Sequence, residues 1–223
     1  MRLSFKRKIL RVTLRPLMYL FTKTEFYVAE HIPETGPLMV VTNHLSRLDI
    51  PLLFLTPKRE EIRAMVTDKY LEYPFLNIII LLAESIWLDR TKADYAAFRQ
   101  AEDVLKEGYA LGISPEGTRS KEGKLQAGKP GAALLASKTG VTIVPVGLAG
   151  TESGFKELLR FKRPRLIARY GPSFKLEPLN RENRSEKLQA YTDEIMCRIA
   201  ALLPEEYRGV YANHPDLYKY LSQ

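Results

Sequence analysis

The feature of this sequence that most constrains its fold is the regular alternation of short apolar segments with segments of helical periodicity. Short apolar runs bounded by turn residues predict strands, and apolar residues that recur about every three or four positions predict helices. Strands are predicted over residues 25–29, 37–42, 62–66, 85–88, 110–113, 142–146 and 166–170, and helices over 49–55, 73–82, 93–106, 131–138 and 185–203. This order predicts a single α/β domain, in which a mixed, mostly parallel sheet is flanked by helices.

The first 24 residues carry most of the net charge of the protein. They contain seven of its 34 Lys and Arg residues and none of its 26 Asp and Glu residues, so the rest of the chain is nearly neutral. A domain that binds nucleic acid normally carries a basic face of its own. We therefore do not expect nucleic acid as a partner.

The same segment predicts a basic amphipathic helix at the N-terminus. Its apolar residues recur at helical spacing, at Leu3, Leu10, Leu14, Leu17 and Phe21, and its arginines follow a different stripe, at Arg7, Arg11 and Arg15. Such a helix is typical of an anionic membrane surface. The alternative is a terminal helix that packs on the domain and keeps its charges in water. Pro16 predicts a kink or a division within the helix.

No stretch of about 18 apolar residues, the length needed to cross a bilayer, is found in the sequence. The closest run, residues 75–88, is interrupted by Asn77 and Glu84. Arg11 and Arg15 interrupt the first apolar stretch, which argues against a cleaved signal peptide. We expect residues 1–24 to form a membrane-binding helix and residues 25–223 to form the folded domain.

His44 is the histidine whose position most clearly predicts chemistry. It follows the apolar run at residues 39–42 and stands five positions before Asp49, where a helix is predicted to begin. Loops at the carboxyl ends of strands are where α/β sheets build their sites. An ionised Asp49 bonded to one ring nitrogen would fix the tautomer of His44 and leave the other nitrogen free to take a proton.

A second polar segment, residues 114–120, follows another predicted strand and is expected at the same edge of the sheet. It contains Glu116, Gly117, Thr118 and Arg119. A loop of this composition can present amide donors and a forked guanidinium to a phosphate group. Taken alone, the segment could equally be a solvated turn.

The remaining histidines, His31 and His214, lie in turn-like contexts that contain proline. Together with Cys197, which is the single cysteine, they offer no spacing typical of metal ligands. We expect neither a metal nor another cofactor.

Four blocks in a fixed order resemble those of the glycerolipid acyltransferase family. The segment Thr42-Asn43-His44-Leu45-Ser46-Arg47-Leu48-Asp49 resembles the family's His-four-residues-Asp motif, and Pro115-Glu116-Gly117-Thr118-Arg119-Ser120 resembles its Glu-Gly-Thr-Arg signature. Residues 86–90 occupy the place of the block that ends in a phosphate-contacting Arg, and residues 143–146 resemble the family's Val-Pro-Val block. The resemblance covers about residues 37–150 and is strongest to 1-acylglycerol-3-phosphate acyltransferases.

The resemblance implies direct transfer of a fatty acyl group to the sn-2 hydroxyl of 1-acylglycerol 3-phosphate (lysophosphatidic acid), giving phosphatidic acid for phospholipid biosynthesis. The donor is acyl-CoA or an acyl carrier protein. His44 would act as the base and Asp49 would orient it. The implied phosphate-binding group comprises Arg90, Glu116, Gly117, Thr118, Arg119 and Lys129, in which Glu116 holds the loop or its ligand. The resemblance further implies a peripheral enzyme at the cytoplasmic face of the cell membrane.

Three other interpretations stay open at this point. The same chemistry could act on glycerol 3-phosphate or on another lyso-lipid. A pair such as His44 and Asp49 could instead activate water against a thioester, which would make the protein a hydrolase. A non-enzymatic module that binds a membrane or an acyl carrier protein is the third.

Overall fold

The computed structural model of the protein describes residues 4–59, 61–89, 95–180 and 184–221. Its helices and strands follow the order α1 (Phe5–Phe21), β1 (Lys23–Tyr27), β2 (Leu38–Thr42), α2 (Asp49–Phe54), β3 (Arg63–Thr67), α3 (Pro74–Leu82), β4 (Ile86–Leu88), α4 (Tyr95–Lys106), β5 (Ala110–Ile113), α5 (Gly131–Thr139), β6 (Thr142–Ala149), α6 (Gly154–Leu158), β7 (Arg165–Tyr170) and α7 (Arg184–Ala201). The predicted alternation is confirmed. Helix α6 was not predicted, because five residues are too few to show helical periodicity.

The seven strands form one sheet in the order β1-β7-β6-β2-β5-β3-β4. Neighbouring strands are parallel except β6 and β7, which are antiparallel, so the predicted mixed, mostly parallel sheet is confirmed. Strand β2 lies between β5 and β6, and Val41 is paired with Ile113 of β5. The loops that follow β2 and β5 therefore leave the sheet side by side at one edge.

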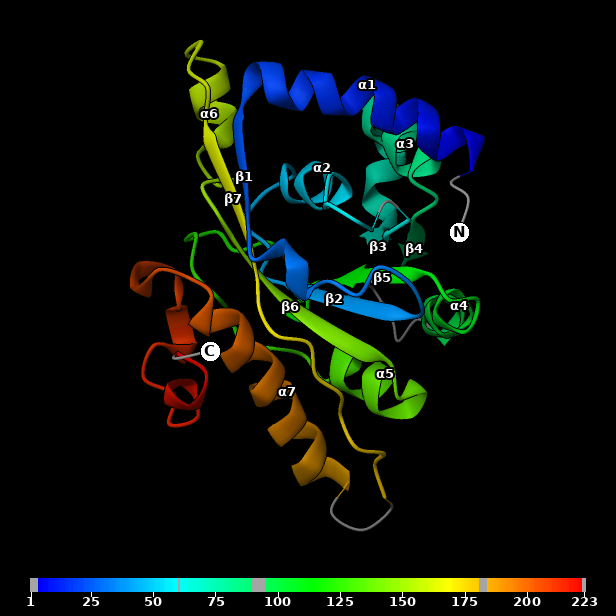
Figure 1. Ribbon diagram of the computed structural model, residues 1–223, viewed down its shortest axis with the longest axis vertical. Coiled ribbons are helices and arrows are strands. Elements are labelled where there is room, and N and C mark those ends of the chain that lie inside the picture. Colours follow the sequence, from blue (N-terminus) through cyan, green and yellow to red (C-terminus); the bar gives the residue numbers. More distant parts are fainter. Residues whose placement is uncertain (1–3, 60, 90–94, 181–183, 222–223) are drawn as a thin grey trace.

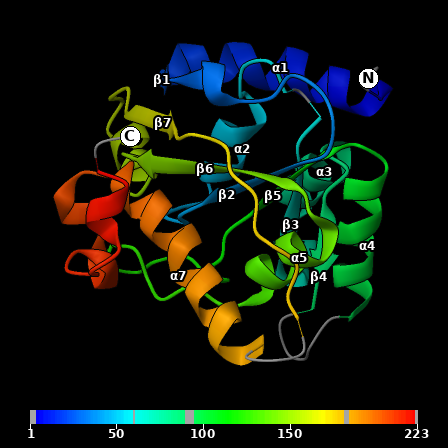
Figure 2. The ribbon, with the colours of Figure 1, turned by 60° about the horizontal axis from the view of Figure 1, so that its bottom comes forward.

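Helices cover both faces of the sheet, with α1, α2 and α3 on one side and α4, α5 and α7 on the other (Figures 1 and 2). Strand β2 is buried along its whole length, and its side chains alternate between two cores. Met39 and Val41 join the core beneath α4, α5 and α7, whereas Leu38 and Val40 join the core beneath α2. This burial on both sides explains why the strand reads as a continuous apolar run.

Helix α1 packs on the body of the protein through Arg7. This residue, expected on an exposed basic stripe, is only 2% exposed. Its guanidinium donates hydrogen bonds to the carbonyl oxygens of Ile62 and Ala83, and its Nε lies 3.1 Å from Oε2 of Glu84. The exposed position expected for Arg7 is therefore wrong, because the body offers its donors a carboxylate and two carbonyl oxygens.

The outward face of α1 is apolar. The exposed fractions of Phe5, Val12 and Leu20 are 78%, 74% and 65%, and Ile9 is also exposed. Of the predicted apolar stripe, the inward side includes Leu10 and Leu14, whereas Leu17 and Phe21 are exposed. Pro16 lies inside α1 without dividing it. Among the described residues, no helix combines the length and the apolar character needed to cross a membrane.

The C-terminal segment folds back along α7 as three short 3₁₀ turns, Glu205–Tyr207, Gly209–Tyr211 and Leu217–Lys219. Tyr211 and Leu217 of these turns are buried in the core that α7 covers.

Candidate active site

The side chain of Asn43 fixes the loop that follows β2. Its amide nitrogen donates to the carbonyl oxygen of Leu148 at 2.9 Å, and its amide oxygen accepts from the N–H of Leu148 at 2.8 Å. These two hydrogen bonds extend the pairing of β2 with β6 by one residue beyond the end of β2, through the Asn43 side chain. The next residue, His44, is thereby placed against the end of β6.

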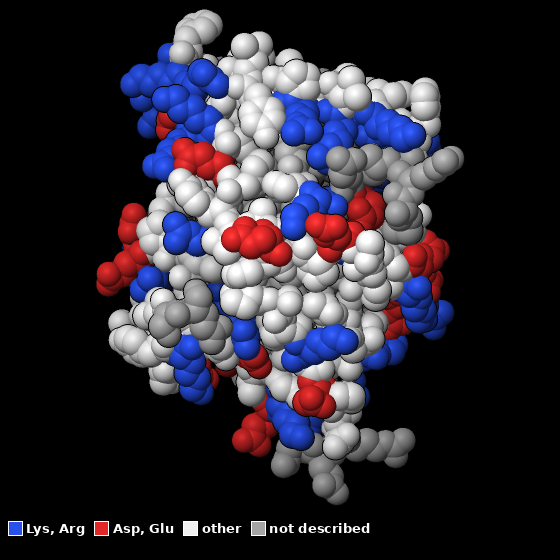
Figure 3. Space-filling view, in the orientation of Figure 1, with Lys and Arg blue, Asp and Glu red and all other residues white. Residues whose placement is uncertain are grey.

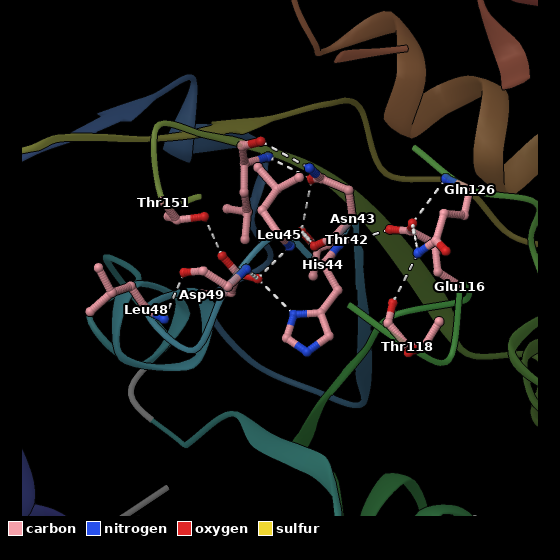
Figure 4. Close-up of polar contacts among 12 residues, drawn as sticks. Thr42, Asn43, His44, Leu45, Leu48, Asp49, Glu116, Thr118, Gln126 and Thr151 are labelled. Atoms are coloured by element: carbon pink, nitrogen blue, oxygen red, sulfur yellow. Dashed lines mark hydrogen bonds and ion pairs between the residues drawn. The ribbon is translucent and has the colours of Figure 1, made fainter. Parts of the chain in front are cut away.

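His44 and Asp49 are hydrogen-bonded to each other. Nδ1 of His44 lies 2.6 Å from Oδ2 of Asp49, whose side chain is only 3% exposed. Figure 4 shows that the other ring nitrogen of His44, Nε2, points away from Asp49. His44 also lines a cavity of the protein. The pair thus has the arrangement of an oriented general base.

Asp49 is held by donors on both of its oxygens. Besides His44, Oδ2 accepts from the backbone N–H groups of Leu45 at 2.7 Å and Ser46 at 2.8 Å. Oδ1 accepts from the hydroxyl of Thr151 at 2.5 Å. Because several of these bonds would break if the carboxylate rotated, Asp49 is a fixed acceptor for the imidazole N–H.

The sequence analysis did not identify Thr151, although its position after a predicted strand was a signal for the site. It follows β6, which runs parallel to β2, so it leaves the sheet at the same edge as His44. A polar residue just after a strand at this edge is a candidate for the site. Its side chain is fully buried.

Glu116 connects the loop after β5 to the loop after β2. Its Oε1 accepts from the N–H of His44 at 2.8 Å, and its Oε2 accepts from the N–H and the side-chain amide of Gln126 at 2.9 and 3.1 Å (Figure 4). Burial raises the pKa of the Glu116 carboxyl, and the hydrogen bonds from Gln126 and His44 oppose that rise. This geometry suits a residue that holds the loop, one of the two roles that the resemblance implies.

A cavity of about 640 Å³ opens beside His44. One part of its lining, the cationic wall, carries four residues of the expected phosphate-binding group, Gly117, Thr118, Arg119 and Lys129. Ser120 of the same predicted loop also lines it, as does Lys121, which sequence reasoning did not identify. Among the described residues, no Asp or Glu lines this cavity. Arg119, Lys121 and Lys129 therefore create a positive potential that suits an anionic group.

Gly117 allows Lys129 to pack across the loop. Its backbone has a φ of +67°, and a Cβ at this position would lie 3.1 Å from Cδ of Lys129. The N–H of Lys129 donates to the carbonyl oxygen of Pro115 at 2.7 Å, which closes the loop. A side chain at residue 117 would be strained and would also displace Lys129.

A second part of the lining, the apolar wall, consists of apolar residues. It is formed by Ile50, Met65, Val66, Leu88, Phe98, Ala101, Ile113 and Leu135. One space therefore joins a candidate base, a cationic wall and an apolar wall, which together suit an amphiphile that carries an anionic group.

The C-terminal segment supports the loop that carries Lys129. The N–H of Gly128 donates to the hydroxyl of Tyr211 at 3.1 Å, and the N–H of Leu125 donates to the carbonyl oxygen of Tyr207 at 2.8 Å. Residues that match no motif in the sequence thus hold the cationic loop in place.

Arg90, which the resemblance places in the phosphate-binding group, lies outside the described residues. Nδ1 of His31 lies 3.3 Å from the carbonyl oxygen of Tyr170, and Nδ1 of His214 lies 3.3 Å from Sγ of Cys197. Neither of these histidines lines the cavity.

Comparison with known proteins gives the site its context. A family model described as Acyltransferase matches residues 23–149. The 1-acyl-sn-glycerol-3-phosphate acyltransferase of Borreliella burgdorferi is 32% identical over 129 residues, which cover 57% of this chain and 51% of that protein. The alpha form of this enzyme from Mus musculus is 30% identical over 163 residues, which cover 70% of this chain and 56% of that protein.

A solved structure is also similar. The crystal structure of the 1-acyl-sn-glycerophosphate acyltransferase PlsC from Thermotoga maritima matches with a TM-score of 0.66 and 26% identity, over 85% of this chain and 76% of that chain. The chain belongs to the Acyltransferase family. It spans about half the length of the curated relatives named above.

Proposed function

We propose that the protein transfers a fatty acyl group from a thioester to the sn-2 hydroxyl of 1-acylglycerol 3-phosphate, which gives phosphatidic acid. The observation that carries the proposal is the cavity whose lining combines His44 with a cationic and an apolar wall. The names of the similar proteins in Borreliella burgdorferi and Mus musculus support the same acceptor.

In the proposed reaction, Nε2 of His44 takes the proton of the acceptor hydroxyl as its oxygen attacks the thioester carbonyl. The C–S bond breaks as the C–O ester bond forms, and the thiolate that leaves accepts the proton from the imidazolium. Asp49 keeps the imidazole in the required tautomer through the bond of 2.6 Å. A positioned general base contributes typically ~10²–10⁴-fold to the rate.

The acceptor phosphate would bind at the cationic wall of the cavity. Arg119 can form two parallel hydrogen bonds with a phosphate, and Lys129 adds a point charge across the loop. Helix α5 begins at Gly131, which lines the same cavity, so its N-terminal end adds a favourable dipole. Arg90 would join this group according to the family resemblance.

The apolar wall would receive a fatty acyl chain. Its residues come from both faces of the sheet, including Ile50 of α2, Phe98 of α4 and Leu135 of α5. Burial of a fatty chain is favourable by roughly 0.8 kcal/mol for each methylene group. Either acyl-CoA or an acyl carrier protein would present the same thioester carbonyl to His44.

We also propose that α1 lies on the cytoplasmic face of the cell membrane. Phe5, Ile9, Val12 and Leu20 project from its outer face, and Lys8 and Arg15 are exposed on the same helix. An outward apolar stripe with basic residues beside it is the pattern of an interfacial helix on anionic lipid. The lysophosphatidic acid acceptor and the phosphatidic acid product of the proposed reaction reside in that lipid.

The direct test measures the release of free thiol from a thioester donor, with and without lysophosphatidic acid. The donors are palmitoyl-CoA, oleoyl-CoA and an acyl carrier protein that carries a fatty acyl group. We expect release that depends on the acceptor and falls by about 10²–10⁴-fold in His44→Ala. His31→Ala is the matched control, because His31 lies outside the cavity. Release without acceptor would indicate a hydrolase, and faster release with glycerol 3-phosphate would reassign the acceptor.

A second test concerns the phosphate. Arg119→Ala is expected to raise KM for lysophosphatidic acid by about tenfold or more, since a charge-assisted hydrogen bond is lost. KM for monoacylglycerol, which lacks the phosphate, should change little. Equal changes for both acceptors would remove Arg119 from the phosphate site.

A further inference from the structure

The segment between β6 and β7 exposes an unusual cluster of apolar and basic side chains. Phe155, Leu159 and Phe161 are 48%, 83% and 100% exposed. The basic residues of the same segment, Lys156, Arg160, Lys162 and Arg163, are exposed as well. We refer to residues 154–163 as the tip. A cluster of large exposed apolar side chains marks a surface that meets a partner.

The tip has a defined backbone conformation. After α6 the chain closes a turn in which the N–H groups of Arg160 and Lys162 donate to the carbonyl oxygen of Glu157 at 2.9 and 3.0 Å. Phe161 has a φ of 56°, a left-handed conformation that is unfavourable for a bulky residue. The fold gains no buried contact from this side chain, so its exposure calls for a reason outside the fold.

The tip is fixed to the end of α1. The guanidinium of Arg163 donates to the carbonyl oxygens of Tyr19 at 2.6 Å and Thr22 at 2.9 Å, and the N–H of Lys23 donates to the carbonyl oxygen of Pro164 at 2.8 Å. Figures 1 and 2 show α1 and the tip at the same end of the molecule. In Figure 3 uncharged residues form the upper edge above these elements, and Lys and Arg lie directly beneath them.

The tip is also close to the candidate base. Thr151, which donates to Asp49, precedes Phe155 by four residues, a length of chain that spans at most about 14 Å. Gly154 packs on α2 so closely that a Cβ would lie 2.4 Å from Cδ1 of Leu48, the neighbour of Asp49. Whatever binds the tip is therefore held near His44 and Asp49.

We propose that the tip is a second membrane contact. Phe155, Leu159 and Phe161 enter an anionic lipid surface, and the basic residues Lys156, Arg160 and Lys162 meet its headgroups. Apolar side chains surrounded by cations match such a surface in both respects. A symmetric contact between two copies of the tip would instead bring like charges together. The inference deepens the proposed function, since it places the acyl transfer site next to the lipid that holds its acceptor.

The first test uses the full chain and vesicles of phosphatidylcholine with phosphatidylglycerol. Phe161→Gly should lower the vesicle partition coefficient by about tenfold, because the aromatic side chain no longer enters the lipid. Its melting temperature should not fall, since glycine adopts a positive φ without cost. Tyr218→Ser, which removes a side chain that is 68% exposed in the C-terminal segment, is the matched control and should bind like the wild type.

The second test changes charge. Lys156→Glu with Lys162→Glu should reduce binding to the anionic vesicles by more than tenfold and leave binding to pure phosphatidylcholine unchanged. Lys175→Glu with Lys187→Glu alters the net charge equally at exposed positions outside the tip and should have little effect.

Wild-type partitioning in both tip variants would overturn the proposal. Loss of self-association in sedimentation, with vesicle binding unchanged, would assign the tip to a contact between copies and would also overturn it. Vesicle binding needs no catalysis, so it separates this inference from the proposed function. A protein that binds through the tip but transfers no acyl group would refute only the function.

Discussion

The hydroxyl of Thr151 donates a hydrogen bond of 2.5 Å to Oδ1 of Asp49, across a separation of 102 residues. The opposite oxygen of the same carboxylate lies 2.6 Å from Nδ1 of His44. Thr151 thus sets the orientation of the candidate base through Asp49, from the loop that leads directly to the exposed tip.

Replacing Thr151 by Val should lower kcat for acyl transfer by about tenfold to a hundredfold. Valine keeps the shape of the side chain but cannot donate, and a hydrogen bond to a charged group is worth about 1.5–3 kcal/mol. Thr151→Ser should recover most of the loss. A Thr151→Val enzyme with a wild-type kcat and pH profile would show that Asp49 does not depend on this bond.

The carboxyl of Glu116 should make the free energy of unfolding fall as the pH rises from mildly acid values. Burial raises the pKa of this carboxyl above its ordinary value of 4.5, so the folded state holds its proton more tightly than the unfolded state. The resulting stabilisation is present below pH 4.5 and is lost as the pH rises through the higher pKa of the folded state. The wild type should therefore lose stability relative to Glu116→Gln over this range in urea titrations. A difference that does not vary with pH would contradict this.

Arg7→Met should destabilise the protein by about 3–5 kcal/mol. It leaves two buried carbonyl oxygens without their donor and leaves Glu84 with only the more distant Arg63, at 3.9 Å, as its cation. Burial lowers the pKa of Arg7, and the ion pair with Glu84 opposes that fall. Lys8→Met, a change at an exposed position of the same helix, should stay within about 0.5 kcal/mol of the wild type. Chemical denaturation monitored by circular dichroism would compare the two, and equal stabilities would rule out Arg7 as the anchor of α1.

Cys197 should be almost inert in the folded protein. Burial and the nearby carboxylates of Asp216 and Asp193 raise the pKa of this thiol from 9.0 to about 12. Since only the thiolate reacts, alkylation by iodoacetamide at pH 9 should be at least about a hundredfold slower in native buffer than in denaturant. Mass spectrometry would follow the reaction. Similar rates in the two conditions would show an accessible, ionised thiol.

The raised pKa of Cys197 also has a stability consequence. Because the folded state retains the proton between pH 9.0 and about pH 12, the stabilisation from this thiol is complete below pH 9.0 and declines above it. A Cys197→Ala variant should lack this decline.

The amino-acid sequence by itself determined the features of this protein that depend on local pattern. The apolar runs of β2 and β5 predicted strands because each is buried on at least one face. The spacing of four residues between His44 and Asp49 brought their side chains together within one loop and the first turn of α2. The order of the strands in the sheet was not predicted, because pairing between distant strands is not encoded in any single segment.

Only the tertiary structure decided which distant residues complete the site and which face of a helix meets the body. Thr151 reaches Asp49 because β6 lies beside β2, and Tyr211 supports Gly128 because the C-terminal segment folds back along α7. Arg7 is buried because Glu84 and two carbonyl oxygens happen to face it, a complementarity that no helical stripe reveals. Hydrogen bonds between distant segments depend on where the whole chain places both partners, and hydrophobic periodicity records only local spacing.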